Sequence, residues 1–301
     1  MASPARPVRH PDLLPTLWAW GASLGVVAVV AALVGFLLLR GGGSLGLPLF
    51  FGDAAPLDVL LRGEPVWDGI WPACLGTLAL VVLATAMAVP LGVACGIYLA
   101  SYATARVRAV LGFGVDVLAG APSIVMGLFG FALILFLRRT VAPRANTCLL
   151  LAAACIALLV LPYLVTATRN ALEGLPESLR LAGAGLGLGR WQTLAHILLP
   201  ASGRGIMGGL ILALGRAAED TAVILLTGVV ANAGAPRALG DKFEALPFHI
   251  YYLAAEYRSP DDLAWAFGAA LVLLAMTSLL FLGAYWLHRT MERRWAGGRV
   301  M

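Results

Sequence analysis

The chain has 301 residues, of which 60% are hydrophobic and 12% are charged, and its mean hydropathy is +0.89. A soluble domain carries about 25% charged residues, so this composition excludes an ordinary soluble protein and predicts a membrane protein. The net charge of +5 does not indicate nucleic-acid binding, because the basic residues lie mostly beside apolar segments, where they orient a chain in the bilayer.

Six apolar segments are long enough to cross a bilayer, which takes about 20 apolar residues. They cover residues 18–39, 71–99, 110–137, 147–168, 205–230 and 263–287. We therefore expect an all-α, polytopic membrane protein with six transmembrane helices in one domain, residues 18–288. An N-terminal segment, 1–17, precedes this domain, and a tail, 289–301, follows it.

Basic residues at the two ends predict the orientation of the chain. Arg6 and Arg9 precede the first span, and four arginines follow the last: Arg289, Arg293, Arg294 and Arg299. Because Lys and Arg concentrate on the cytoplasmic side, we expect a multi-pass protein of the bacterial inner membrane, surrounded by lipid, with both termini in the cytoplasm. Against this rule, three arginines fall in a loop that then faces outward: Arg138, Arg139 and Arg144.

Two segments on the expected outer side, 41–70 and 231–262, are too polar to span the membrane. The second contains an aromatic run, residues 246–252, which is typical of the membrane interface. An interfacial belt and a docking surface for a partner are both open interpretations of this run.

The long loop between the fourth and fifth spans, residues 169–204, is amphipathic. It predicts a helix-turn-helix at the cytoplasmic surface, broken at Pro176 and ended at Pro200, with glycines in the turn between the two pieces.

This loop resembles the coupling loop of ABC importer permeases, whose pattern is Glu-Ala-Ala, three residues, Gly, nine residues, Ile, one residue, Leu-Pro. Gly187 matches the glycine, and Ile197 and Leu199-Pro200 follow in register, whereas Leu181-Ala182-Gly183 replaces Glu-Ala-Ala. The resemblance implies a MetI-like six-helix permease whose loop docks on a separate ATPase. The residues implied in this coupling are Glu177, Ala182, Gly183, Gly187, Ile197, Leu199 and Pro200, with Glu173 as an alternative to Glu177 for the acidic contact.

Further motifs are similar to the PstA type of phosphate permease. They include Gly69–Ala73, Gly120–Val125, Trp191-Gln192-Thr193 and Leu214–Ala217, and the resemblance extends over residues 69–285. It implies the permease subunit of an ATP-driven ABC importer that moves inorganic phosphate into the cytoplasm by alternating access. The implied partners are a second homologous permease (PstC-like), ATPase subunits (PstB-like) that bind the ATP and Mg, and a periplasmic phosphate-binding protein (PstS-like).

Three charged residues lie close together in the fifth predicted span. Arg216 precedes Glu219 by three residues and Asp220 by four, so on a helix its guanidinium can reach either carboxylate. A purely structural ion pair is one interpretation. The other is a substrate pathway, because arginine offers planar donors that suit phosphate oxygens and intramembrane charges usually serve function.

The two carboxylates leave this face net negative, so we expect an arginine of the partner permease to complete a weak site. We expect Thr221 and Ser123 to add hydroxyl donors to the pathway. Pro122 is expected to break the third span, where freed backbone groups line a cavity. Asp116, in the third span, is interpreted as a helix-packing partner.

Alternative functions are a permease for sulfate, molybdate or phosphonate, or a membrane sensor or scaffold subunit. An intramembrane enzyme lacks support, because the sequence contains no HExxH or GxSxG motif. No Walker A motif occurs, which predicts a transport subunit with no catalytic residues and no cofactor of its own. The four histidines show no ligand spacing and the four cysteines form no CxxC pair, so we expect no metal site.

Overall fold

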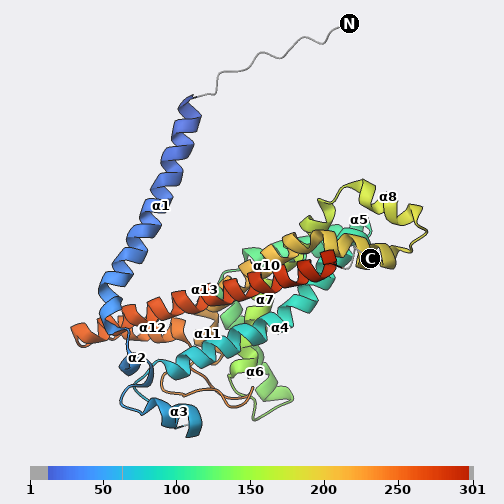
Figure 1. The fold of residues 1–301 in the computed structure, drawn as a ribbon. Coiled ribbons are helices and arrows are strands. Elements are labelled where there is room, and N and C mark those ends of the chain that lie inside the picture. Colours follow the sequence, from blue (N-terminus) through green and yellow to red (C-terminus); the bar gives the residue numbers. More distant parts are fainter. Residues whose placement is uncertain (1–12, 63, 298–301) are drawn as a thin grey trace.

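The computed structural model describes residues 13–62 and 64–297 (Figure 1). Over these ranges the chain is helical, and its one β-type contact is an isolated bridge between Val229 and Phe243. Six of the described helical segments are long and apolar enough to cross a membrane: Pro15–Ser44, Trp71–Ser101, Ser123–Thr140, Leu149–Glu173, Arg190–Glu219 and Pro260–Trp286. The expected all-α fold with six spans is confirmed.

The helices follow one another along the chain, with loops and short helices between the long ones. In order they are α1 (Leu13–Gly41), η1 (Gly42–Ser44), α2 (Leu47–Phe51), α3 (Pro56–Arg62), α4 (Trp71–Ser101), α5 (Ala105–Gly120), α6 (Ser123–Thr140), α7 (Leu149–Glu173), α8 (Glu177–Gly185), α9 (Arg190–Thr193), the π-helical turn η2 (Leu194–Leu198), α10 (Leu199–Glu219), α11 (Ala222–Thr227), α12 (Leu246–Ala255) and α13 (Pro260–Gly297).

Helix α7 forms the centre of the bundle and packs against α4 and α10. Gly92 and Gly96, one turn apart on α4, let the two backbones approach. A Cβ atom on Gly92 would lie 2.6 Å from the Cβ of Leu164, and one on Gly96 would lie 2.6 Å from the Cβ of Thr168. Small residues four positions apart are the usual means of close packing between membrane helices.

Helix α1 stands apart from this bundle over most of its length (Figure 1). Its most apolar window is 0% buried, and its contacts with the rest of the chain are at its C-terminal end. There the ring of Phe36 meets the ring of Phe267 on α13 edge to face, with centroids 5.5 Å apart. The apolar surface of α1 is thus open to lipid or to another protein.

The third predicted span, 110–137, is divided between two helices. Helix α5 ends at Gly120, and α6 begins at Ser123, because Ala121 and Pro122 are extended with ψ of 127° and 139°. A residue before proline is pushed out of the helical region, which explains the break predicted at Pro122. Only α6 qualifies as a span, and Asp116 is an exposed residue of α5, with no side-chain hydrogen bond or ion pair among the described residues.

The fifth predicted span, 205–230, is also wrong in its bounds. Helix α10 ends at Glu219, Asp220 is extended, and the short α11 follows. The expectation that a helix ends at Pro200 is contradicted as well. Pro200 lies in the first turn of α10, where its missing N–H would have no helical partner, and the preceding π-helical turn joins α9 to α10.

The two polar segments form short helices and loops and do not span. Residues 41–70 contain η1, α2 and α3, and the 228–245 loop leads into α12. This loop is fixed to the bundle by the Leu246 N–H, which donates to the Thr77 hydroxyl at 2.8 Å. Glu244 is buried, and its carboxylate accepts the Gly234 N–H at 2.7 Å.

Part of the predicted terminal organisation lies outside the described residues. This applies to residues 1–12 of the segment 1–17, including Arg6 and Arg9, and to residues 298–301 of the tail, including Arg299. Residues 289–297 continue α13.

Candidate functional site

Arg216 lies in the last turn of α10, and the chain continues past it into α11. Gly205 and Gly209 of α10 approach Ala171 and Ala167 of α7, and Gly228 approaches Cys148 at the start of α7, so this turn lies level with the middle of α7. A cation is favourable at this position, because the exposed carbonyls of a helix C-terminus carry partial negative charge. The chain leaves the helix at Asp220, whose φ of −75° and ψ of 111° are extended. The charged cluster therefore lies at a break between two helices.

Asp220 links the two helices across this break. Its Oδ2 lies 2.9 Å from Nη2 of Arg216, and its Oδ1 accepts the N–H of Val223 in the first turn of α11 at 2.9 Å. The side chain of Asp220 is 2% exposed, whereas that of Arg216 is 38% exposed. Both carboxylate oxygens are occupied, so Asp220 holds the arginine and caps α11 at the same time.

Glu219 does not share this arrangement. It is an exposed residue, and no ion pair or hydrogen bond of its side chain occurs among the described residues. The spacing allowed Arg216 to pair with either carboxylate, and the structure selects Asp220 because the chain turns away from the helix there.

Ser123 and Thr221 lie on the elements that meet beside the break. Helix α6 packs on α11 at Gly127, where an added Cβ would lie 3.0 Å from the Ala222 carbonyl oxygen. Ser123 is one turn before Gly127 on the same face of α6. Both hydroxyl residues are half-buried, and neither is hydrogen-bonded to Arg216 or Asp220 within the described structure.

The arrangement leaves one side of the Arg216 guanidinium available to an anion. One of its five N–H donors points to Asp220, and the side chain remains partly exposed. The pair is neutral, and the exposed Glu219 adds a negative charge beside it. This chain alone therefore offers an oriented donor group and no strong anion site.

A cavity of about 810 Å³ lies at the end of the bundle where α4 begins. It is enclosed by α3, the start of α4 and the 228–245 loop, and its lining includes Trp67 and Trp71. Its charged lining residues are Arg62, Glu64, Arg237, Asp241 and Lys242. The cations exceed the carboxylates by one, and the Asp241 carboxylate is occupied by the N–H groups of Arg237 and Ala238.

The 169–204 loop extends from the opposite end of the bundle (Figure 1). As predicted, the chain breaks at Pro176, and α8 begins at Glu177. Gly187 has a φ of +73° in the turn between α8 and α9, a conformation that favours glycine. Gly183 is buried where α8 packs on α9, and a Cβ there would lie 2.5 Å from Cγ2 of Thr193.

The residues implied in coupling fall into two groups. Glu177, Ala182 and Gly187 are exposed on the loop. Ile197 packs against a small core formed by Ala100, Leu172, Leu194 and Leu198, while Leu199 and Pro200 are half-buried at the start of α10. The first group can contact another protein, and the second anchors the loop to the bundle.

The sequence analysis did not identify the apolar surface of this loop. Leu181, Leu186 and Trp191 are exposed by 64%, 74% and 67% on an otherwise amphipathic segment. Exposed apolar side chains grouped on a projecting loop are typical of a protein interface. The signal was present in the Leu-Gly-Leu-Gly run and in Trp191, but the turn that exposes them depends on the backbone at Gly187.

No group of three or more metal-ligating side chains occurs among the described residues.

The chain matches a family model described as "Binding-protein-dependent transport system inner membrane component" over residues 92–297. It is 33% identical to phosphate transport system permease protein PstA 1 of Mycobacterium tuberculosis over 78% of this chain and 76% of that relative. It is 30% identical to PstA 2 of Mycobacterium bovis over 98% of this chain and 95% of that relative. It is 32% identical to PstA of Haemophilus influenzae over 78% of this chain and 83% of that relative.

Two solved structures share the fold. The inward-facing MetNI methionine ABC transporter superposes with a TM-score of 0.53 at 18% identity, over 79% of this chain and 99% of that one. A bacterial ABC transporter involved in the import of the acidic polysaccharide alginate superposes with a TM-score of 0.58 at 15% identity, over 91% of this chain and 99% of that one. At these identities the likeness concerns the fold alone.

Proposed function

Since this chain belongs to the binding-protein-dependent transport system inner membrane components, and among them to the PstA-type phosphate permeases, we propose that it moves inorganic phosphate across the membrane as the permease subunit of an ABC importer. The observation that supports this most directly is the identity of 30% or more to PstA relatives, which reaches 98% of the chain in one case. The six-span fold supports the same conclusion.

Arg216 is the proposed contact for phosphate. Asp220 orients its guanidinium and neutralises it, while the exposed side leaves planar donors for phosphate oxygens. Binding is weak because the pair is neutral, so an arginine of a second permease completes the site, and Ser123 and Thr221 add hydroxyl donors. Weak binding suits a pathway that must also release its substrate. Glu219 sets the local charge.

The cavity beside Arg237 and Lys242 supports a route for an anion at the other side of the bundle from the 169–204 loop. Arg62 is paired with Asp58 at 3.2 Å, whereas Arg237 and Lys242 have no ion pair among the described residues. These two cations raise the local concentration of phosphate without holding it. We place this cavity outside the cell and the 169–204 loop and both termini in the cytoplasm, in a bacterial inner membrane. The arginines at the chain ends and at Arg106 and Arg108 support this orientation.

The partners are a second homologous permease, ATPase subunits and a periplasmic phosphate-binding protein. The unaccompanied apolar surface of α1 supports a helical partner in the membrane. The exposed Leu181, Leu186 and Trp191 support a protein partner on the 169–204 loop, and ATP is hydrolysed there by the partner, since this chain has no Walker A motif.

Transport in reconstituted vesicles tests the proposal. The chain is combined with the candidate second permease, ATPase and receptor from the same genome, and initial uptake of radioactive phosphate is measured with and without ATP. We expect ATP-dependent uptake that excess sulfate does not inhibit. ATP-dependent uptake of sulfate in place of phosphate would refute the substrate, and absence of any ATP-dependent uptake by the assembled complex would refute the transport function.

A further inference from the structure

A second pocket lies between the ends of α4 and α7 and the starts of α5 and α8. Its volume is about 430 Å³, and its charged lining residues are Arg108, Arg169, Glu173, Glu177 and Arg180. The pocket is at the end of the bundle that carries α8, while Arg216 lies at the other end of α10. A helix of this length spans roughly 30 Å, so the two places are separate.

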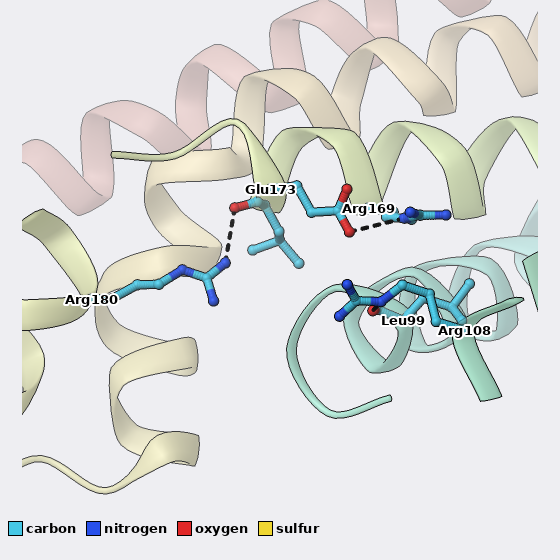
Figure 2. A network of polar contacts seen from close by, with 6 residues as sticks. Leu99, Arg108, Arg169, Glu173 and Arg180 are labelled. Atoms are coloured by element: carbon cyan, nitrogen blue, oxygen red, sulfur yellow. Dashed lines mark hydrogen bonds and ion pairs between the residues drawn. The ribbon is translucent and has the colours of Figure 1, made fainter. Parts of the chain in front are cut away.

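Two arginines are fixed at this pocket by the ends of neighbouring helices. Nε of Arg108 donates to the Leu99 carbonyl in the last turn of α4 at 3.0 Å, and Nη2 of Arg180 donates to the Leu172 carbonyl in the last turn of α7 at 3.3 Å. Figure 2 shows the two guanidinium groups approaching the same space from opposite sides. Each contact uses one of five N–H donors, and no other hydrogen bond or ion pair of either arginine occurs among the described residues.

The charges of the pocket leave these donors for an external anion. Glu173 is taken by Arg169, whose Nε lies 3.0 Å from Oε1 (Figure 2). Glu177 is exposed and has no ion pair in the described part of the chain. Three guanidiniums face two carboxylates, and the two that carry no carboxylate of their own are Arg108 and Arg180. The planar guanidinium groups of these two arginines suit the oxygens of a phosphate group.

We propose that this pocket binds an anionic phosphate group between Arg108 and Arg180. Because Arg108 belongs to α5 and Arg180 to α8, the bound group ties the 169–204 loop to the membrane bundle. The group is supplied either by the headgroup of an anionic phospholipid, since the pocket adjoins the ends of the spans, or by free inorganic phosphate. Basic pockets at this level of a membrane protein accept lipid headgroups.

Binding of two probes to the full-length chain in nanodiscs, with any partners that copurify and without nucleotide or receptor, tests the site. One probe is radioactive inorganic phosphate in phosphatidylcholine discs, and the other is phosphatidylglycerol retained by the chain in native mass spectrometry. In the double variant Arg108→Gln and Arg180→Gln we expect binding of one probe to weaken about tenfold or more. Loss of phosphate binding identifies the free ion as the source, and loss of phosphatidylglycerol alone identifies the lipid.

Matched variants separate this site from charge in general and from the transport pathway. The double variant Arg139→Gln and Arg144→Gln removes two exposed arginines at the other end of the bundle and is expected to keep the signal. Arg216→Gln measures the part of the phosphate signal that belongs to the transport pathway, and the pocket variant is expected to lose binding in addition to that part. If the variant Arg108→Gln and Arg180→Gln does not fold, Arg108→Lys with Arg180→Lys replaces it. These lysines keep the charge but lose the planar set of N–H donors, so binding is expected to weaken as well. Equal binding of both probes by wild type and the pocket variant, or loss of the signal only with Arg216→Gln, would overturn the proposal.

Discussion

The buried carboxylate of Asp220 lies 2.9 Å from the guanidinium of Arg216, one helical turn further along the chain and just beyond the end of α10. The same carboxylate accepts the Val223 N–H and so begins α11. The orientation of the arginine and the break between the two helices thus depend on one side chain. A change at Asp220 is expected to affect both.

Asp220→Asn and Asp220→Ala separate these two roles. Both variants lose the ion pair, but the Asn amide oxygen still accepts the Val223 N–H, whereas Ala leaves this buried donor without an acceptor. Loss of such a cap costs about 1 kcal/mol. We therefore expect Asp220→Ala to unfold at a lower detergent concentration than Asp220→Asn in a sodium dodecyl sulfate titration. Identical midpoints would show that Asp220 does not cap α11.

Gly187→Leu is expected to abolish stimulation of ATP hydrolysis while leaving membrane insertion intact. Its φ of +73° costs a residue with a side chain about 1 to 2 kcal/mol, so the turn between α8 and α9 changes conformation and displaces the exposed apolar side chains beside it. The measurement is ATPase activity of the reconstituted complex, with the amount of inserted protein as reference.

Gly185→Ala is the matched control for this turn. A Cβ at either glycine meets nothing within 4 Å, but only Gly187 has a positive φ. Gly185→Ala is expected to keep normal coupling, and Gly187→Asn to retain most of it, because Asn tolerates this conformation. Normal stimulation by Gly187→Leu would contradict the role of the loop in coupling.

The number of spans could be predicted from the sequence because each contains an apolar run of bilayer length. The break at Pro122 was also predictable, since proline restricts the residue before it. The break at Asp220 was not, because no glycine or proline occurs there and the apolar run continues beyond it. The expected helix end at Pro200 was wrong because a proline breaks the interior of a helix but is tolerated in its first turn, where Pro200 lies.

The candidate site could be predicted only in part. The four-residue spacing brings Arg216 and Asp220 together on any helix, but the same reasoning allowed Glu219, and only the path of the chain after α10 decides between them. The pocket at Arg108 and Arg180 could not be found from spacing, because these residues are far apart in the sequence and meet through the packing of four helices.

The orientation of the chain is tested by single cysteines in a variant that lacks the four native ones. Cysteines that replace Ala55 and Gly240, both exposed in the two outer segments, are expected to react with an impermeant thiol reagent added to intact cells. A cysteine at Gly185 is expected to react only after the membrane is opened. Labelling of position 185 in intact cells would reverse the orientation and remove the argument for coupling.

Glu244 gives the 228–245 loop a predictable response to pH. Burial raises the pKa of this carboxyl above its ordinary value of 4.5, and hydrogen bonds from Gly234 and Ala233 oppose the rise. The folded protein therefore binds this proton more tightly than the unfolded chain does. Its contribution to stability is complete below pH 4.5 and is lost as the pH rises through the higher folded pKa.

Glu244→Gln removes this titration while its amide oxygen still accepts the Gly234 N–H. Relative to wild type, the variant is expected to gain thermal stability as the pH is raised from about 4.5 to 8. A stability difference that stays constant over this range would show that the carboxyl does not titrate as its burial predicts.

Initial phosphate uptake by Arg216 variants tests the central claim most directly. It is measured in cells without other phosphate importers and normalised to the amount of each variant in the membrane, with Arg139→Lys as a control at an exposed arginine. Arg216→Lys keeps the charge and can still pair with Asp220, but it loses the planar fork. A lost hydrogen bond to a charged group corresponds to a decrease of about tenfold or more, so we expect Arg216→Lys to lose that much uptake and Arg216→Ala to lose more. Wild-type uptake by both variants at normal abundance would contradict a role of Arg216 in phosphate passage and leave it only as the structural partner of Asp220.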